Sequence, residues 1–327
     1  MAQTTSEVWD SRWSSTRRTV RPEVIDNYFE QHPTVAEHRK GGMQITDRGG
    51  KEISVILQSS GSTAVAFDKY DNIGKNPVDP FQTAHFKRRY YAVPIILSDT
   101  ENWENSGPEQ IFDLLNALGD NAMDSLVKAI NEDILGAQSG KTILGYQDII
   151  ADAAGATVGG INSGNDTWWE SQRDTTATTF TTQTVTNIFN GVSRWNSVMD
   201  LCRIQGGNSF CLVTTHSIGR AYREGVSSMG YAETRLSSAQ GIGGPILPTF
   251  YGNKVIADND CKALATYFVE KNHVKLNVMR QANFRKTQFV SLQPNGQLAQ
   301  LAYMVAGVQL TTNNRRRSGV ATAITGA

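Results

Sequence analysis

The chain has 327 residues, enough to bury a sizeable core, and this length gives an expectation of about two domains. Its 31 Lys and Arg residues balance 31 Asp and Glu residues, so no overall charge attracts the chain to nucleic acid or to an anionic membrane. No apolar run approaches the about 18 residues of a membrane-spanning helix, and the three cysteines lack C-x-x-C spacing, so we expect synthesis in a reducing cytoplasm.

Residues 1–42 are polar and rich in Ser, Thr and Arg. Such a segment cannot bury enough apolar surface to fold alone, so it is either disordered or an N-terminal arm that lies on a neighbouring molecule. Trp9 and Trp13, four residues apart in this polar setting, favour a contact with a neighbour. Arg17 and Arg18 form a small basic group on the same arm, and we assign them to that contact.

Residues 43–98 predict a long β-hairpin. Residues 51–57 and 84–97 are rich in β-branched and aromatic side chains and read as its strands, and residues 58–83 between them are dense in Gly, Pro, Asn and Asp. A loop of that length is unusual in a compact domain unless it has a function, so we expect the hairpin to reach away from its own body. Phe67, Tyr70 and Phe81 are its candidate contact residues.

Residues 108–138 predict one long helix, which we call the spine helix. The N-terminal signals are a capping box between Ser106 and Glu109 and a proline, Pro108, in the first turn. Gly136 marks the C-terminal end. Apolar residues recur at steps of three and four, which places on one stripe Ile111, Leu115, Leu118, Ala122, Leu126, Ile130 and Ile134.

The second half of the chain alternates strand and helix patterns. Helices are expected over residues 184–204 and from 216 to about 225. Strands are expected over residues 210–214, 254–257, 266–270, 274–279, 286–292 and 300–311. This alternation predicts a mixed α+β body.

No compact catalytic motif is present in the sequence. Residues 136–142 resemble a phosphate-binding loop, but only three residues separate the glycines and the segment follows a helix, so we interpret it as a turn. The five histidines are scattered, and Asp258 and Asp260 are interpreted as turn residues rather than cation ligands. We interpret Cys202 and Cys211 as buried, inert thiols. We therefore expect no cofactor and no metal.

Two further basic groups remain to be assigned. Lys87, Arg88 and Arg89 are followed by two tyrosines, a mixture that suits either ion pairing with a neighbouring subunit or contact with a packaged polyanion. All three are candidate contact residues. The other group, Arg315–Arg317, is interpreted as a solvated turn.

Several short motifs, in a shared order, resemble tailed-bacteriophage major capsid proteins of the HK97-like fold family. The motifs are Ser60 to Phe67 (SGSTAVAF) with Tyr70-Asp71, Asp79 to Phe86 (DPFQTAHF), Asn105-Ser106-Gly107 ahead of the spine helix, Thr157 to Ile161 (TVGGI), and Trp168-Trp169. The similarity covers most of residues 40–200 well and the remainder in outline. Each motif is weakly specific alone, but their common order is specific.

The resemblance implies an α+β, HK97-like capsid fold divided into six segments. These are an N-terminal arm at 1–42, an extended β-hairpin loop at 43–98, a peripheral domain at 99–183 containing the spine helix, an axial domain at 184–275, return strands of the peripheral domain at 276–309, and a C-terminal segment at 310–327 that returns to the axial domain. In that family the hairpin loop lies over an adjacent subunit and the arm reaches a neighbour.

The resemblance further implies a non-enzymatic virion protein, made in the bacterial host cytoplasm, whose copies form the hexamers and pentamers of an icosahedral shell around double-stranded DNA. Implied partners are other copies, a portal protein, a scaffolding protein, a decoration protein and non-specific contact with the packaged DNA. No long scaffolding segment precedes the arm, so either a separate scaffolding protein acts or such a segment was removed. Two alternatives stay open: an encapsulin-type compartment shell, and a metal-dependent enzyme with a dispersed site.

Overall fold

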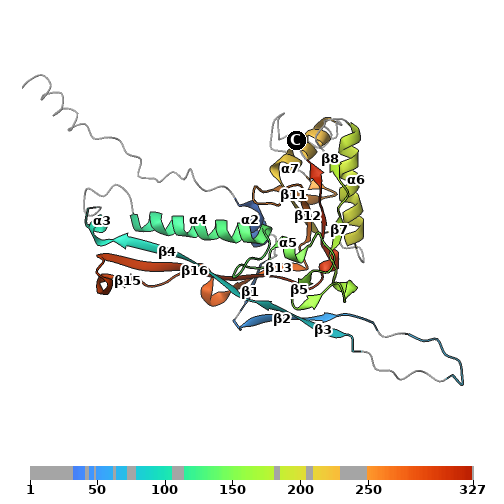
Figure 1. The fold of residues 1–327 in the computed structure, drawn as a ribbon, viewed down its shortest axis with the longest axis horizontal. Helices are drawn as coiled ribbons and strands as arrows, with labels where there is room; N and C mark the ends of the chain where they lie inside the picture. The colour runs from blue at the N-terminus through green and yellow to red at the C-terminus, as the bar shows by residue number, and fades with distance from the viewer. Residues whose placement is uncertain are drawn as a thin grey trace, which may run out of the picture.

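The computed structural model describes residues 32–40, 44–47, 49–61, 64–71, 79–104, 114–179, 185–203, 209–228 and 249–325. It shows a two-part body with one projecting hairpin (Figure 1). One part is elongated and carries the spine helix, and the other stands upright at one end of it. Because both parts combine helices with sheets, the predicted α+β class is confirmed.

The spine helix, α4, spans Leu114–Leu135 and packs on one face of a six-stranded sheet, which we call the long sheet. Ala122, Leu126, Ile130 and Ile134 are buried, as the stripe predicts, whereas Ile111 and the side chain of Leu115 lie outside the described residues. The order of the long sheet is β1 (Gln44–Asp47), β13 (Val274–Met279), β16 (Ala299–Thr312) and β14 (Arg285–Lys286), and both β4 (Arg89–Ser98) and β15 (Val290–Ser291) also pair with β16.

The upright part is built on a second six-stranded sheet, the upright sheet. Its order is β10 (Thr249–Phe250), β11 (Asn253–Ala257), β9 (Phe210–Thr214), β12 (Thr266–Glu270), β17 (Gly319–Ala321) and β7 (Gln172–Asp174). Helices α6 (Val185–Cys202) and α7 (His216–Ser228) pack against it. The Trp195 ring lies 4.9 Å from the Tyr222 ring and 5.3 Å from the Phe250 ring, so aromatic packing fills this core. Cys202 and Cys211 are free thiols and both are buried, so the prediction that they are buried is confirmed.

The hairpin consists of β2 (Glu52–Gln58) and β3 (Phe81–Lys87), paired antiparallel from Glu52 opposite Lys87 to Gln58 opposite Phe81. It leaves the body beside the small strands β5 (Thr157–Val158) and β6 (Ile161–Asn162) (Figure 1). The prediction of one strand over 84–97 is wrong, because the chain changes partner at Arg88. Residues before it pair with β2, and residues after it pair with β16 in the long sheet.

Two other sequence predictions are corrected. Residues 286–292 do not form one strand, since only the short strands β14 and β15 pair with β16 there. Arg315–Arg317 is a 3₁₀ turn, η6, but Arg315 is only 1% exposed, so this turn is not wholly solvated. The remaining short elements are α3 (Asp99–Glu104), α5 (Tyr146–Ile149), β5 (Thr157–Val158), β6 (Ile161–Asn162), η2 (Thr167–Trp169), β8 (Thr178–Thr179), η4 (Arg280–Ala282), η5 (Gln293–Asn295) and β18 (Ile324–Thr325).

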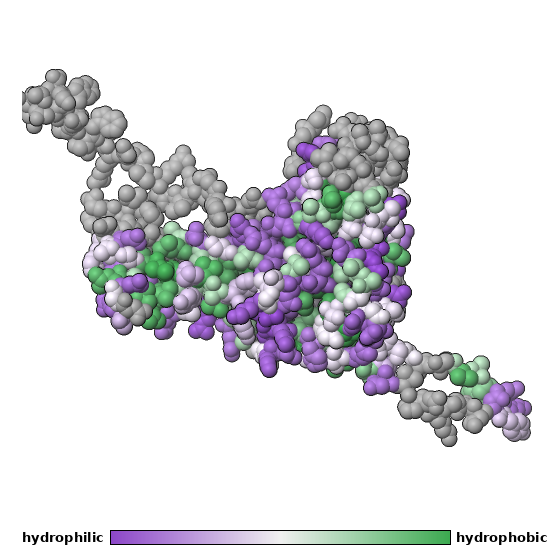
Figure 2. Space-filling view, in the orientation of Figure 1, coloured by the Kyte–Doolittle hydropathy of each residue, from purple (hydrophilic) through white to green (hydrophobic). Residues whose placement is uncertain are grey.

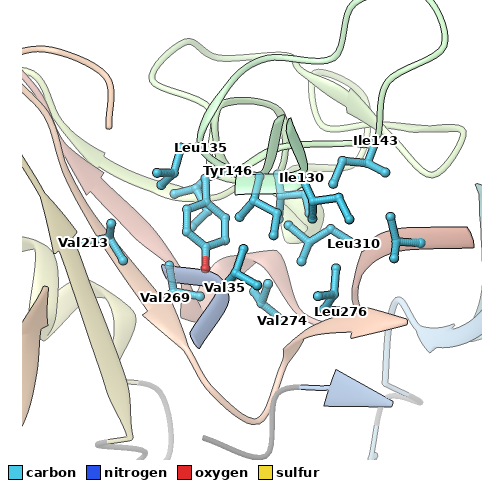
Figure 3. Close-up of a cluster of buried hydrophobic side chains, with 14 of the residues drawn as sticks. Val35, Ile130, Leu135, Ile143, Tyr146, Val213, Val269, Val274, Leu276 and Leu310 are labelled. Atoms are coloured by element: carbon cyan, nitrogen blue, oxygen red, sulfur yellow. The ribbon is translucent and has the colours of Figure 1, made fainter. Parts of the chain in front are cut away.

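One continuous apolar core joins the two parts of the body. It forms where the short helix α2 (Pro33–Lys40), α4 and α5 meet both sheets (Figure 3). Val35 of α2, Ile130 of α4 and Tyr146 of α5 lie beside Val213 and Val269 of the upright sheet and Leu276 and Leu310 of the long sheet. Because this core is shared, the angle between the two parts is fixed by packed side chains rather than by a linker.

Candidate intersubunit surfaces

The hairpin exposes large apolar side chains along its length. Ile56 is 74% exposed and Phe81 is 61% exposed on the paired strands. Beyond them, Val65, Phe67 and Tyr70 are exposed on the segment 64–71. Figure 2 shows hydrophobic residues on this projection, at the right of the molecule. Contiguous exposed apolar groups on a soluble protein mark a surface that binds something.

The base of the hairpin is held by the turn between β5 and β6. The amide of His85 donates to the Gly159 carbonyl oxygen at 2.9 Å, and Ala84 and Phe86 are fully buried beneath this turn. Gly159 has φ +63°, and a Cβ there would lie only 2.8 Å from the Ala84 Cβ. The direction in which the hairpin leaves the body therefore depends on a glycine at this position.

The basic group at the hairpin base is divided between two environments. Arg88 is 8% exposed, and its Nε and Nη2 donate to the carbonyl oxygens of Gly50 and Gly49 at 2.8 and 3.0 Å. Lys87 is exposed and Arg89 is half-buried. The guanidinium of Arg88 thus closes its own hairpin, while Lys87 remains accessible to a partner.

A second apolar surface covers the face of the long sheet opposite α4. Side chains alternate along β4, so that Ile95 and Leu97 are buried while Tyr90 and Ile96 are exposed by 59% and 55%. Tyr303 continues this surface on β16. A shallow groove beside it is lined by Gln281, Ala282, Arg285, Thr287, Gln288, Val290, Tyr303 and Val305.

Arg285 is the one charged residue among those that line this groove. Residues 271–327 contain no Asp or Glu, and their cationic residues are Lys271, Lys275, Arg280, Arg285, Lys286, Arg315, Arg316 and Arg317. Arg280, Arg285 and Lys286 are exposed, and Arg285 lines the groove, whereas the hairpin segment 64–71 carries Asp68, Lys69 and Asp71. The groove lining therefore carries a positive charge and the segment 64–71, with two Asp and one Lys, a net negative one, which suits contact between copies of the chain.

The sequence-predicted contact residues are placed as follows. Phe67, Tyr70 and Phe81 lie exposed on the same projection, whereas Trp9, Trp13, Arg17 and Arg18 lie outside the described residues. The sequence reading missed Ile56, Tyr303 and Val290. The exposure of Ile56 could have been predicted from the alternation of side chains along β2, because its neighbour Leu57 is buried. Tyr303 and Val290, in contrast, are brought together only by the pairing of β15 with β16.

None of the described helices is long and apolar enough to cross a membrane. Within the described ranges, no group of three or more His, Cys, Asp or Glu side chains is arranged to hold a metal ion. Asp258 and Asp260 form the predicted turn, in which the Asp260 amide donates to Asp258 Oδ1 at 3.1 Å.

No protein-family model and no curated protein sequence matches the chain. Solved structures do match. The chain is similar to a protein of the cyanophage A-1(L) capsid asymmetric unit, with a TM-score of 0.71 and 13% identity over 96% of this chain and 99% of that chain. It is also similar to a capsid chain of the native GTA particle, with a TM-score of 0.69 and 13% identity over 99% of this chain and 100% of that chain.

A third similar structure comes from the holo-SrpI encapsulin complex of Synechococcus elongatus PCC 7942, with a TM-score of 0.59 and 9% identity over 99% of this chain and 96% of that chain. Identities this low establish the fold alone. The chain therefore has the HK97-like α+β fold of phage capsid shell proteins, as the sequence resemblance implied.

Proposed function

We propose that this chain is the major capsid protein of a tailed bacteriophage, whose copies form the hexamers and pentamers of an icosahedral shell around double-stranded DNA. The observation that carries the proposal is the near-complete overlap of the fold with phage capsid chains. The exposed apolar hairpin supports it independently, because that hairpin lacks a covering surface within the described part of its own chain. The chain acts as a structural protein and needs no cofactor.

In this proposal the hairpin of one copy crosses the exposed face of the long sheet on an adjacent copy. Phe67 and Tyr70 supply apolar surface, and Asp68 and Asp71 meet the cationic edge near Arg285. The elongated part corresponds to the peripheral domain and the upright part to the axial domain. Residues 1–42 act as an arm on a neighbour, through Trp9 and Trp13, and portal, scaffolding and decoration proteins are further partners.

An encapsulin-type compartment shell is the second candidate, because an encapsulin chain has the same fold. The two functions differ in what the shell encloses. The phage-like order of the hairpin motifs favours the virus, and the balanced charge of 31 cations and 31 anions fits a protein that packs against itself in either case.

The test is to express the full chain, alone and with the genes that flank it, and to examine the products by negative-stain electron microscopy and mass photometry. We expect rings of five and six copies or closed shells. Particles purified from the natural source are then assayed for nuclease-protected DNA and for enclosed protein. A chain that stays monomeric in every setting contradicts a shell function, and enclosed cargo protein without DNA assigns the encapsulin alternative.

A further inference from the structure

Helix α2 is attached to both parts of the body through polar contacts. At its N-terminal end, the amide and Oγ1 of Thr34 donate to Asp258 Oδ2 at 3.4 and 2.7 Å, and the Val35 amide donates to Asn131 Oδ1 at 3.3 Å. Asn131 belongs to α4, and Asp258 follows β11 of the upright sheet. Asn131 Nδ2 also donates to Asp258 and, at 2.7 Å, to Asp260. The start of α2 thus lies in a network shared by both parts.

The middle of α2 is held by charge. Glu37 accepts from Lys254 Nζ at 2.7 Å and from Lys271 Nζ at 2.9 Å, and its side chain is 11% exposed. Burial raises the pKa of Glu37, but the hydrogen bonds and charges of Lys254 and Lys271 outweigh it and leave this pKa below its ordinary value. Glu37 is therefore ionised at neutral pH and ties α2 to β11 and to the turn after β12.

His38 is a buried ionisable residue on α2. It is 1% exposed, its Nε2 lies 2.6 Å from the Tyr146 hydroxyl, and its buried Nδ1 has no hydrogen-bond partner. Figure 3 shows the Tyr146 hydroxyl directed toward α2. In the neutral imidazole one nitrogen binds the hydroxyl, but a protonated imidazole must place a second N–H where no acceptor lies. The pocket is therefore built for the neutral ring.

The charges around His38 reinforce this preference. Burial lowers the pKa of His38 to about 4, with the charge of Glu37 opposing the shift and that of Lys275 on β13 adding to it. Tyr146 on α5 stays protonated, because burial raises its pKa well above the ordinary value. The titratable groups that surround this position from every packed element are Glu37, Tyr146, Cys211, Lys254, Asp258, Cys261, Lys271 and Lys275.

We propose that α2 is an acid-releasable clasp between the two parts of the body, and that His38 is the group whose protonation releases it. At neutral pH the helix joins α4 to the upright sheet. In acid, His38 becomes protonated, and water can solvate the imidazolium only when α2 has left its docked position. Glu37 also loses its charge in acid. Since Val35 is the only apolar side chain of α2 that is fully buried, little apolar contact opposes release. The clasp lies within one copy, so this inference does not depend on the proposed function.

The direction follows from linkage. A histidine whose pKa is lower when docked favours docking above its ordinary pKa of about 6.5 and loses that contribution as the pH falls toward 4. The docking equilibrium should weaken about tenfold per pH unit over this interval, or about 300-fold in all. Glu37, whose pKa is also lowered, adds to the loss in the same direction at the acid end.

The experiment is hydrogen exchange measured by mass spectrometry on the full chain between pH 7 and pH 4, with rates corrected for intrinsic exchange. We expect peptides covering 33–40 to lose protection as the pH falls while peptides covering 114–135 keep it. His38→Gln retains a polar group near the Nε2 position without the titration, so its α2 protection should be nearly independent of pH down to about 5. His273→Gln, at a half-buried histidine outside α2 that lies beside Asn313, is the matched control and should behave like the unmodified chain.

Constant α2 protection across this range, or an equal loss in His38→Gln, would overturn the proposal. If His38→Gln does not fold, the imidazole of His38 is titrated by NMR in the unmodified chain instead. A ring that stays neutral until about pH 4, with release of α2 on the same curve, supports the clasp. A ring that titrates near 6.5 in the docked helix refutes it.

Discussion

The guanidinium of Arg315 connects four backbone carbonyls inside the body. Its Nε donates to Ile149 at 2.7 Å, Nη1 to Trp169 at 3.1 Å and Ala156 at 3.4 Å, and Nη2 to Asp148 at 3.3 Å. Burial lowers its pKa to about 10, so it stays charged at neutral pH. Arg315→Met removes these four hydrogen bonds, although the Ala156 carbonyl still accepts from the Ser163 amide and hydroxyl, and should lower the free energy of unfolding by about 3 kcal/mol or more.

The measurement is the denaturant midpoint, and the adjacent residue provides the control. Arg316 is exposed, so Arg316→Met should change stability by less than about 0.5 kcal/mol. If both substitutions lowered the free energy of unfolding equally, the buried hydrogen bonds of Arg315 would contribute nothing to stability. The sequence reading treated three consecutive arginines alike, because nothing local distinguishes the one that the fold places beneath residues 148–169.

Gly159 offers a second prediction for a single residue. Gly159→Ala adds a Cβ 2.8 Å from Ala84 and occupies a left-handed φ, so it should strain the hairpin base by about 1–3 kcal/mol. Gly160→Ala carries the same kind of backbone strain at φ +85°, but its Cβ meets open space, so it isolates the contact. Thermal melting of both variants provides the comparison, and Ala84→Gly should partly restore Gly159→Ala. A lack of rescue argues against the contact.

At the level of whole elements, the sequence predicted the spine helix well and the hairpin boundary poorly. The spine has one periodic stripe facing one sheet, so pattern and burial coincide at Leu126, Ile130 and Ile134. At Arg88 two strands follow one another with one residue between them, and both are rich in aromatic and β-branched side chains. Which partner each strand takes depends on β2 and β16, which are far away in the sequence, so no local pattern marks the break.

The hairpin is the element whose removal best separates folding from assembly. The Ser59 amide donates to the Pro80 carbonyl oxygen at 2.7 Å, so the two strands are already joined where the extended segment begins. Deleting residues 60–78 therefore shortens the loop without disturbing β2 and β3. We expect an unchanged circular dichroism spectrum and a complete loss of closed particles by electron microscopy. Normal shells from this variant would refute a bridging role for the hairpin.

For the molecule as a whole, the exposed apolar surfaces imply a body whose stability increases when copies associate. A partner that binds only the folded state raises the melting temperature in a concentration-dependent way. Calorimetry at increasing protein concentration should therefore show melting temperatures that rise by several degrees for the full chain. At this chain length each kcal/mol of stabilisation raises the melting temperature by about 2 °C or less, so such a rise corresponds to a few kcal/mol of association free energy.

The variant lacking residues 60–78 is the matched control, since it keeps the core but loses the projecting surface and should melt at one temperature throughout. A full chain that melts independently of concentration, and with the same midpoint as that variant, would mean that Phe67 and Tyr70 have no partner surface in solution. If both chains instead show the same concentration dependence, the copies associate through the face of the long sheet around Tyr303 without the hairpin. Because the fold leaves the hairpin and this sheet face uncovered in one copy, we expect a melting temperature that rises with concentration for the full chain and stays constant for the variant.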